Sequence, residues 1–538
     1  IIPSFQACQI DGHDSLVGDV VFQVLELCGT EEEAEAWGNQ GYYASIGTHP
    51  PQFFEDMMIV PVMGSSGNGG RSFIAGYDVS DMDNPTRVWQ TFLVPPATGD
   101  PEWALHECDK GWFFSYKQWK EEGKLGIPCT DVPRENIMND WGVPKHYTSS
   151  VAAIWGQMAI DEETGIVYFG TGNQGGWINN TYTQGPNLFA SSIIALNVTN
   201  GNIEWWYQTV VRDMVQGDAA WNTVLAKLTI DGEEKKVILK YSVTGLLWAL
   251  DAATGEPLWI FESPLLESRT DPDGAIRGRT SGHPCIGCDP NTQDGYWNNV
   301  MSYYDMQEKK WLNYPSKDWF YWIPARAGEA DIAYNEKEGI IILPLSLGWD
   351  ASVKAGNHKG IGVPPGEYNL NYPKQTQNTT ILAIDANTGE EVWSYFIDGV
   401  AYRGGIIATE DLAIIPAADG NLYILNVITG ELLHKIFLNT PLTTQPTIGR
   451  NSDGEFQIYI INGGRGREEI GGLSHNQIPG SLIALGISEE TEMQENITKE
   501  PESENNNVVN SKSIGPILYI ILGIIASSII LISYRRIR

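Results

Sequence analysis

The sequence predicts an all-β fold of repeated antiparallel sheets, a β-propeller. Three observations support this prediction. The 538-residue chain contains 57 Gly, 19 Trp and 23 Tyr, and only 19% of its residues are charged. One sequence pattern recurs along the chain, and the segments between its copies lack the long periodicity of amphipathic helices. Repeated sheets of this kind form propellers, and large repeat-built β folds reach this size as a single unit.

The repeat is an alternating apolar strand, an Asp or Asn, a turn closing on Thr-Gly or Asn-Gly, and a second strand that usually carries Trp. Four copies begin at Ile193, Leu246, Ile381 and Leu422, and a looser fifth begins at Phe73. We expect the Asp or Asn to accept hydrogen bonds from turn amides and the glycine to adopt a positive φ. The second-strand tryptophans are expected to pack between adjacent sheets; these are Trp206, Trp259 and Trp393.

The segment Trp155–Asn173 (WGQMAIDEETGIVYFGTGN) is predicted to form a hairpin with its turn at Asp161–Gly165. It ends in Gly170, Gly172 and Asn173. Glycines let another group approach the backbone closely, and an amide oxygen can bind a hard cation. From these residues alone, one more hairpin of a β-rich protein is the simpler interpretation.

Two insertions separate the repeats, Asp100–Gly142 and Asp271–Tyr296. The six cysteines lie as three neighbouring pairs. A zinc site needs four ligands, and the C-x-x-C pair at residues 285–288 has only His283 beside it, so zinc is disfavoured. Local disulfides formed outside the cytoplasm are the preferred interpretation.

The C-terminal part of the sequence predicts a membrane anchor. Residues 514–534 are apolar and long enough to span a bilayer, and residues 535–538 include three arginines, which places this end in the cytoplasm. Residues 489–513 are polar and acidic and are expected to form a disordered tether. We therefore expect an extracytoplasmic propeller over residues 1–488, held in the cell membrane by a single span.

Charge and the first residues set further bounds. The formal net charge of −33 argues against nucleic-acid binding, because a phosphate-binding surface needs excess Lys and Arg. The sequence does not begin with Met and shows no signal peptide. A removed leader and an N-terminally incomplete sequence both remain open.

The LDxxTGxxxW unit resembles the tryptophan-docking repeat of pyrroloquinoline quinone (PQQ)-dependent alcohol dehydrogenases, the quinoprotein propellers. The similarity covers much of Met63–Gly464. Its best match is the Trp155–Asn173 hairpin, where the family has Trp-Gly, a short hairpin and Gly-Ser/Thr-Gly-Asn at the same spacing. The family is eight-bladed, and for this chain an N-terminally incomplete sequence and a propeller with fewer blades are both open. The resemblance implies that Trp155 is the floor under the quinone and that Asn173 binds a calcium or lanthanide ion. An aromatic face suits a planar cofactor, and hard cations need oxygen donors.

The rest of the family's site matches less well. Its glutamate metal ligand falls in the run Gly64–Arg71, which has no carboxylate. Its proposed catalytic base falls at Gln216, which cannot accept a proton from an alcohol. The basic residue over the quinone carbonyl falls at Val243, with Lys240 three residues earlier.

Three other residues are candidates for the missing groups. Asp218 lies where lanthanide-using members carry an extra carboxylate ligand, so it is a candidate metal ligand and catalytic base; a turn residue is the alternative. Asp213 is a second catalytic candidate. Arg403 is a candidate for binding a carboxylate of the quinone, although it could equally pair with a surface acid.

The resemblance implies a membrane-anchored dehydrogenase that oxidises an alcohol or aldehyde with PQQ and a Ca²⁺ or lanthanide ion, passing electrons to an external acceptor. The C-x-x-C-H motif of c-type haem is absent, since Asp289 follows Cys288. The alternative is a non-catalytic propeller that acts as a surface scaffold or binding module, because a fold does not determine function.

Overall fold

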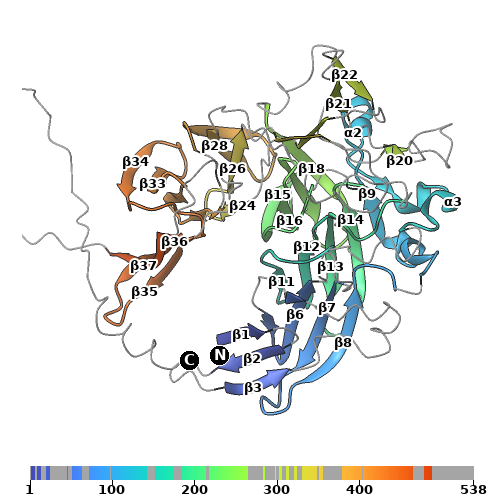
Figure 1. The fold of residues 1–538 in the computed structure, drawn as a ribbon, viewed down its shortest axis with the longest axis horizontal. Helices are drawn as coiled ribbons and strands as arrows, with labels where there is room; N and C mark the ends of the chain where they lie inside the picture. Colours follow the sequence, from blue (N-terminus) through green and yellow to red (C-terminus); the bar gives the residue numbers. More distant parts are fainter. Residues whose placement is uncertain are drawn as a thin grey trace, which may run out of the picture.

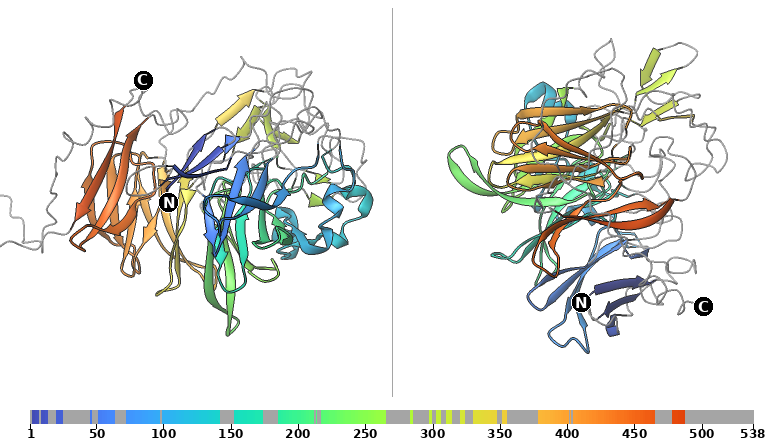
Figure 2. Two further views of the ribbon diagram at one scale, coloured as in Figure 1. Left: turned by 90° about the horizontal axis from the view of Figure 1, so that it is seen from below. Right: turned by 90° about the vertical axis from the view of Figure 1, so that its left-hand side faces the viewer.

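The computed structural model shows sheets that follow one another round an arc in chain order (Figure 1), and two further views show the same succession (Figure 2). It describes residues 2–6, 9–13, 20–24, 45–46, 51–63, 72–96, 99–141, 152–173, 185–211, 213, 217–264, 283–284, 297–298, 302–305, 310–313, 320–323, 330–347, 351–354, 378–400, 402, 404–464 and 478–486.

The first sheets lie in the N-terminal half of the chain. One contains β1 (Ile2–Gln6), β2 (Gln9–His13) and β3 (Val20–Val24). The next contains β4 (Ser45–Ile46), β5 (Gln52–Phe54), β6 (Met57–Met63), β7 (Phe73–Asp78) and β8 (Thr86–Phe92). A six-stranded sheet follows, with β9 (Gly111–Phe113), β10 (Ile127–Pro128), β11 (Ala159–Asp161), β12 (Ile166–Gly170), β13 (Ser192–Asn197) and β14 (Ile203–Gln208).

Later sheets repeat a simple up-and-down order. They are β15 (Thr223–Ile230), β16 (Glu233–Tyr241), β17 (Leu246–Asp251) and β18 (Pro257–Glu262); then β25 (Ala333–Asn335), β26 (Ile340–Leu347), β28 (Asn378–Asp385) and β29 (Glu391–Ile397). After them come β31 (Ile407–Ala408), β32 (Leu412–Pro416), β33 (Asn421–Asn426) and β34 (Leu432–Phe437), and finally β35 (Thr447–Arg450), β36 (Phe456–Gly464) and β37 (Ile478–Gly486).

Shorter strands complete the description. They are β19 (His283–Pro284), β20 (Trp297–Asn298), β21 (Ser302–Asp305), β22 (Lys310–Asn313), β23 (Phe320–Ile323), β27 (Ala351–Lys354), and the parallel pair β24 (Ala330–Asp331) and β30 (Gly404–Gly405).

The five predicted repeats are confirmed as strand pairs, β7–β8, β13–β14, β17–β18, β28–β29 and β33–β34. Their turns use the expected side-chain chemistry. The Oδ1 atoms of Asp251, Asp385 and Asn426 accept backbone N–H bonds from residues two further on, at 3.0, 2.8 and 2.9 Å. Each turn then closes on a glycine of positive φ, for example 72° at Gly255. Only glycine takes this conformation without steric cost.

Tryptophan rings join successive sheets at these turns. A Cβ on the turn glycine would lie 2.5 Å from the Trp205 ring at Gly255 and 2.7 Å from the Trp259 ring at Gly389. The rings therefore rest directly on the glycine backbone of the next sheet. Trp205 also donates its indole N–H to the Ala252 carbonyl at 2.8 Å. Trp89 and Trp393 make the same bond to residues 198 and 427.

The prediction that Trp206 packs between sheets as the repeat tryptophan was wrong, because Trp205 has that place. A β-bulge between Ala195 and Leu196 shifts the register, so that Trp205 pairs with Ala195. The same irregularity occurs in the β17–β18 and β28–β29 pairs. The spacing of four residues from the turn glycine to the tryptophan, shared by Gly255–Trp259, selects Trp205 from the sequence.

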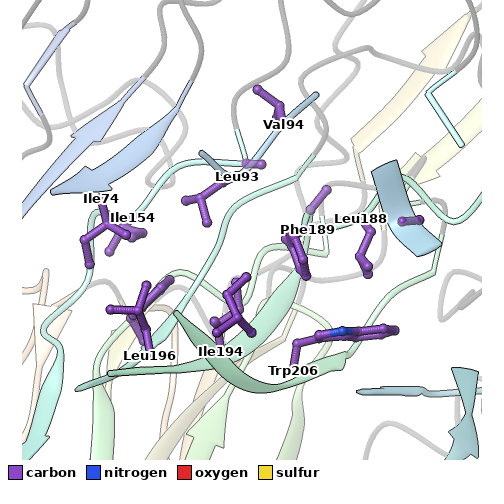
Figure 3. Close-up of a cluster of buried hydrophobic side chains, with 14 of the residues drawn as sticks. Ile74, Leu93, Val94, Ile154, Leu188, Phe189, Ile194, Leu196 and Trp206 are labelled. Carbon is purple, nitrogen blue, oxygen red and sulfur yellow. The ribbon is translucent and has the colours of Figure 1, made fainter. Parts of the chain in front are cut away.

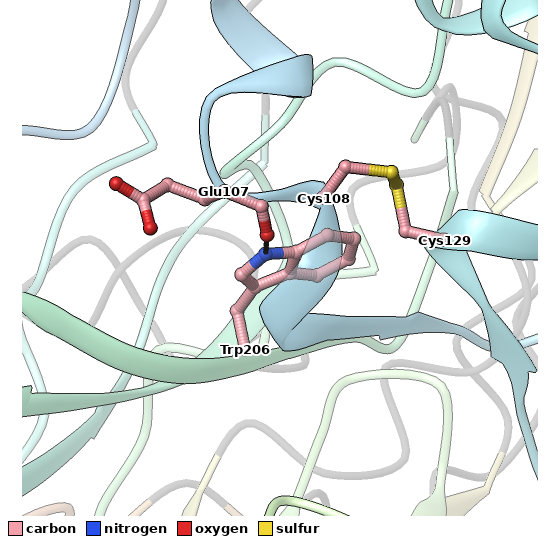
Figure 4. Close-up of a disulfide and its surroundings, with 4 residues drawn as sticks. All are labelled: Glu107, Cys108, Cys129 and Trp206. Atoms are coloured by element: carbon pink, nitrogen blue, oxygen red, sulfur yellow. Dashed lines mark hydrogen bonds between the residues drawn. A yellow bond between two sulfur atoms is a disulfide. The ribbon is translucent and has the colours of Figure 1, made fainter.

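Trp206 instead fixes the predicted insertion to the outer strand β14. Its indole N–H donates to the Glu107 carbonyl at 2.7 Å, close to the Cys108–Cys129 disulfide (Figure 4). Strand β9 runs parallel to β14, and Gly111 pairs with Trp206. This disulfide confirms one of the predicted local cysteine pairs, and the other four cysteines lie outside the part whose side chains the structure describes.

Within the insertion, the chain forms short helices packed on this sheet: η1 (Trp103–Leu105), η2 (Cys108–Lys110), α2 (Tyr116–Glu122), η3 (Cys129–Asp131) and α3 (Arg134–Ile137). Their apolar side chains join those of the sheet in one buried cluster, which includes Leu93, Leu188, Ile194 and Trp206 (Figure 3). The insertion is therefore part of the core, and the Cys108–Cys129 disulfide links two of its segments covalently.

Among the described residues, no helix is long and apolar enough to cross a membrane. The predicted span at residues 514–534, its tether at 489–513 and the basic tail at 535–538 lie outside the described residues. The anchor therefore stays a prediction.

Two glycine substitutions separate the tryptophan contact from the backbone strain. Gly255→Ala places a methyl group against Trp205, whereas a Cβ at Gly232, also at positive φ, meets nothing within 4 Å. We expect Gly232→Ala to lower the free energy of unfolding by about 1–2 kcal/mol. Gly255→Ala should cost at least about 1–3 kcal/mol more, because the ring must move. Urea unfolding measures both, and equal losses would contradict the docking contact.

Candidate functional site

Three of the predicted site residues, Trp155, Asn173 and Asp218, lie at one end of the sheets because of the strand order. The first strands β11, β15, β25 and β31 each begin at this end, and the second strands β12, β16 and β26 return to it, since neighbours are antiparallel. Trp155 and Asp218 precede first strands, and Asn173 follows a second strand. First strands also contact one another, β11 with β15 and β25 with β31.

The predicted hairpin is confirmed and holds Trp155 beside Asn173. Strands β11 and β12 pair in register, with Asp161 opposite Ile166. The chain before β11 stays against the chain after β12, because Gly172 N–H donates to the Ala153 carbonyl at 2.8 Å. The Ala152 N–H donates to the Asn173 carbonyl at 2.9 Å.

Trp155, Gly172, Asn173 and Asp218 form one contiguous group. A Cβ on Gly172 would lie 2.2 Å from the Trp155 ring and 3.2 Å from Oδ1 of Asp218. That Oδ1 accepts the backbone N–H of Asn173 at 2.5 Å and its side-chain Nδ2 at 2.8 Å. Trp155, Asn173 and Asp218 are partly buried. The structure thus brings an indole, an amide and a carboxylate together around a glycine that leaves room for them.

Asp213 has a different environment. It is buried, and its Oδ2 accepts the Ser191 hydroxyl at 2.6 Å and the Gly217 N–H at 2.8 Å. These bonds hold the segment that leads to Asp218. The catalytic role of Asp213 stays a prediction, and its observed contacts are those of a loop-holding residue.

The replaced family positions are only partly described. Val243 is buried and donates its backbone N–H to the Asp218 carbonyl at 3.1 Å, so the residue at the position of the family's basic group is apolar and is joined to Asp218 through the backbone. Gln216, the run Gly64–Arg71 and Arg403 lie outside the described residues. The predicted role of Arg403 in binding the quinone therefore stays a prediction.

Lys240 is a buried cation next to this group. A Cβ on Gly170 would lie 2.6 Å from its Nζ. Lys240 Nζ donates to the carbonyl oxygens of Trp221 and, at 3.1 Å, Asn222, and at 3.0 Å to the hydroxyl of Thr223. Burial lowers the pKa of Lys240 to about 7, against the opposing effect of the Asp331 carboxylate. Lys240 therefore joins residues 221–223 to the chain near Gly170, beside the site residues.

A polar link between neighbouring sheets was missed by sequence reasoning. Asn222 N–H donates to Oδ1 of Asp331 at 2.9 Å, while the Asn222 amide exchanges two 2.9 Å bonds with the backbone of Ile332. The Asp331 carbonyl accepts the Ile406 N–H at 3.3 Å. Asn222 and Asp331 lie just before β15 and β25, as Asp218 does, and that position is the signal that could have indicated them.

Sequence comparison identifies relatives of this chain. A family model described as the glucose/ethanol/alcohol dehydrogenase β-propeller domain matches residues 129–281. The quinohemoprotein alcohol dehydrogenase ADH-IIG of Pseudomonas putida is 25% identical over 411 residues, 74% of this chain and 51% of that protein. The chain is a distant homologue of the PQQ-dependent alcohol dehydrogenase propellers. The quinohemoprotein alcohol dehydrogenase of Comamonas testosteroni is 22% identical over 479 residues, 86% of this chain and 60% of that protein.

Solved structures show the same fold. The Comamonas testosteroni enzyme superposes with a TM-score of 0.61 at 20% identity, covering 94% of this chain and 66% of that one. A europium-containing methanol dehydrogenase superposes with a TM-score of 0.54 at 16% identity, covering 86% and 71%. The predicted quinoprotein-type propeller fold is confirmed. The chain spans between 51% and 58% of the length of three sequence relatives, so their whole activities do not transfer directly.

The buried lysine predicts a specific pH dependence. Unfolded Lys240 keeps its proton up to about pH 10.5, whereas folded Lys240 releases it near pH 7. Between these values the unfolded state binds more protons, so stability rises with pH, by up to about 1.4 kcal/mol per pH unit from this group. We expect Lys240→Met to lose this rise. Urea unfolding at a series of pH values from 7 to 10 compares the two proteins, and parallel curves would contradict the assignment.

Proposed function

We propose that this propeller binds a PQQ-type quinone and a Ca²⁺ or lanthanide ion at Trp155, Asn173 and Asp218, and oxidises an alcohol or aldehyde. The protein would act outside the cytoplasm, held at the membrane by residues 514–534 and passing electrons to an external acceptor. The observation that carries the proposal is the contact of Trp155, Gly172, Asn173 and Asp218 at one end of the sheets.

The described residues fit these groups. The missing Cβ of Gly172 brings the Trp155 ring and the Asp218 carboxylate to the same piece of backbone, and a larger residue there would separate them. The Asn173 amide and the Asp218 carboxylate are oxygen donors of the kind that hard cations prefer. Trp155 is partly buried, and its indole is the kind of aromatic group on which a planar cofactor stacks.

Each residue has a distinct role in this proposal. The bound quinone would accept the electrons of the substrate, and the bound cation would polarise the quinone. Trp155 supports the planar group, and the amide oxygen of Asn173 and the carboxylate of Asp218 hold the cation. The Asp218 carboxylate also takes the proton of the substrate hydroxyl, in place of the family's base, whose position is occupied here by Gln216. The two bonds from Asn173 to Oδ1 fix the orientation of this carboxylate.

A non-catalytic scaffold is the second candidate, and one observation favours it. The position of the family's basic residue is occupied by the buried, apolar Val243. The ammonium group of the nearby Lys240 is already bound by three oxygen atoms of residues 221–223. Loss of an electrostatic group commonly costs a factor of 10² or more in rate. Binding without turnover would support this candidate.

The proposal predicts that Trp155→Ala weakens quinone binding, by about tenfold or more if stacking contributes about 1.5 kcal/mol. The purified ectodomain is titrated with PQQ in the presence of Ca²⁺ or La³⁺, and absorbance reports binding. Asp385→Asn is the matched control, since Asn occupies the same turn position in two other repeats. Equal affinity of the wild type and Trp155→Ala would refute the site.

Turnover gives a separate prediction for Asp218. Asp218→Asn keeps the shape of the side chain but cannot accept the proton, so alcohol-dependent dye reduction by the quinone-loaded protein should fall by about 10²–10⁴-fold. Asp385→Asn should keep the wild-type rate. A wild type that binds quinone and metal but shows no turnover with primary alcohols or aldehydes would favour the scaffold.

A further inference from the structure

We propose that Asp140 is a positioning residue for the candidate site, acting through the strap, residues Gly185–Ser191. The strap connects the disulfide-closed insertion to Gly172 and Asp213, which flank the site residues. The identity of the ligand rests on the proposed function, whereas the positioning role does not.

Asp140 holds the strap by four hydrogen bonds. Its carboxylate accepts the backbone N–H of Asn187 and, at 2.7 Å, that of Leu188. Its carbonyl accepts the Gly185 N–H and the Asn187 side-chain Nδ2, both at 3.1 Å. Asp140 is 1% exposed, and burial raises its pKa to about 8 in spite of the two N–H donors. Burying a carboxyl group is costly unless its bonds are satisfied, so these contacts define its function in the fold.

The insertion fixes Asp140 and grips the strap at a second point. Asn139 N–H donates to the Pro101 carbonyl at 2.8 Å, which ties this end of the insertion to its beginning. The indole N–H groups of Trp103 and Trp141 both donate to the Leu188 carbonyl at 2.7 Å. Three insertion side chains thus bind the backbone of the same two strap residues, Asn187 and Leu188.

The far end of the strap holds the site. Ser191 N–H donates to the Gly172 carbonyl at 2.8 Å, and the Ser191 hydroxyl donates to Asp213 at 2.6 Å. The Thr171 hydroxyl donates to the Phe189 carbonyl at 2.5 Å. The strap therefore holds Thr171, Gly172 and Asp213, the residues next to Asn173 and before Asp218 in the chain.

Hydrogen exchange tests this connection without any ligand. The Asn173 N–H donates to Asp218, so its protection reports the geometry of the site directly. Asp140→Asn replaces one acceptor oxygen by an amide nitrogen, which leaves a buried N–H without its acceptor; this costs about 1–3 kcal/mol and lowers the protection of that amide by about fivefold or more. We expect this loss at whichever of the Asn187 and Leu188 amides faces the new nitrogen, and a smaller loss of several-fold at Asn173. Asp385→Asn should leave all three amides unchanged.

A second variant separates the strap from the fold as a whole. Ser191→Ala removes the bond to Asp213 but keeps Asp140, so it should lower the protection of Asn173 while Asn187 and Leu188 stay protected. This variant also decides the question if Asp140→Asn does not fold. Unchanged protection of Asn173 in Ser191→Ala, or in a folded Asp140→Asn whose strap has loosened, would overturn the proposal.

Quinone binding supplies a readout that a general loss of stability would not move. At a temperature where the variants are fully folded, Ser191→Ala and Asp140→Asn should bind PQQ several-fold more weakly than wild type and alter the absorbance of the bound quinone. Wild-type affinity and spectrum in both variants would contradict positioning. If wild type itself binds no quinone, the proposed function fails, and the exchange rates at Asn173 alone decide the role of Asp140.

Discussion

The structure depends on the contact between a tryptophan ring and the turn glycine of the following sheet. The contact requires glycine for two reasons. The turn residue has a positive φ, and the ring lies where any other residue would have its Cβ. It also requires the bulge that turns the tryptophan toward the neighbouring sheet. Where the repeat has His434 instead, the side chain is exposed, and the turn of the next sheet that would receive it, after β37, lies outside the described residues. Among the described sheets, the docking contact joins the one that contains β7–β8 to that of β13–β14, and then in turn those of β17–β18, β28–β29 and β33–β34.

Because docked sheets stand side by side, loops far apart in the sequence meet at one end. Asn222 and Asp331 are 109 residues apart and are joined by a 2.9 Å bond. The same principle brings Asp218 to Asn173. The insertion and the strap hold the site through the hydrogen bonds of Asp140 and Ser191, and Lys240 holds the neighbouring residues 221–223. Few side chains would carry the chemistry of the site, whereas many hydrogen bonds to backbone atoms fix the geometry of those side chains.

The sequence predicted the local part of this arrangement well. Strand pairs, turn glycines and the hairpin from Trp155 to Asn173 follow from period, turn chemistry and spacing, which act over a few residues. The tryptophan position was predicted one residue away, at Trp206, because a bulge breaks the alternation of a strand and moves the docking role to Trp205. The bonds of Asp140 to the strap span 47 and 48 residues of chain and have no periodic signature. Such contacts exist only once the sheets are assembled.

The central claim is that Asn173 and Asp218 bind a hard cation beside Trp155. The most direct measurement is anomalous diffraction from crystals of residues 1–488 soaked with La³⁺ and PQQ, recorded near the lanthanide edge. We predict an anomalous peak about 2.5 Å from the amide oxygen of Asn173 and from the carboxylate of Asp218, with the quinone stacked on Trp155. A lanthanide peak elsewhere on the protein, with quinone bound away from Trp155, would contradict the account.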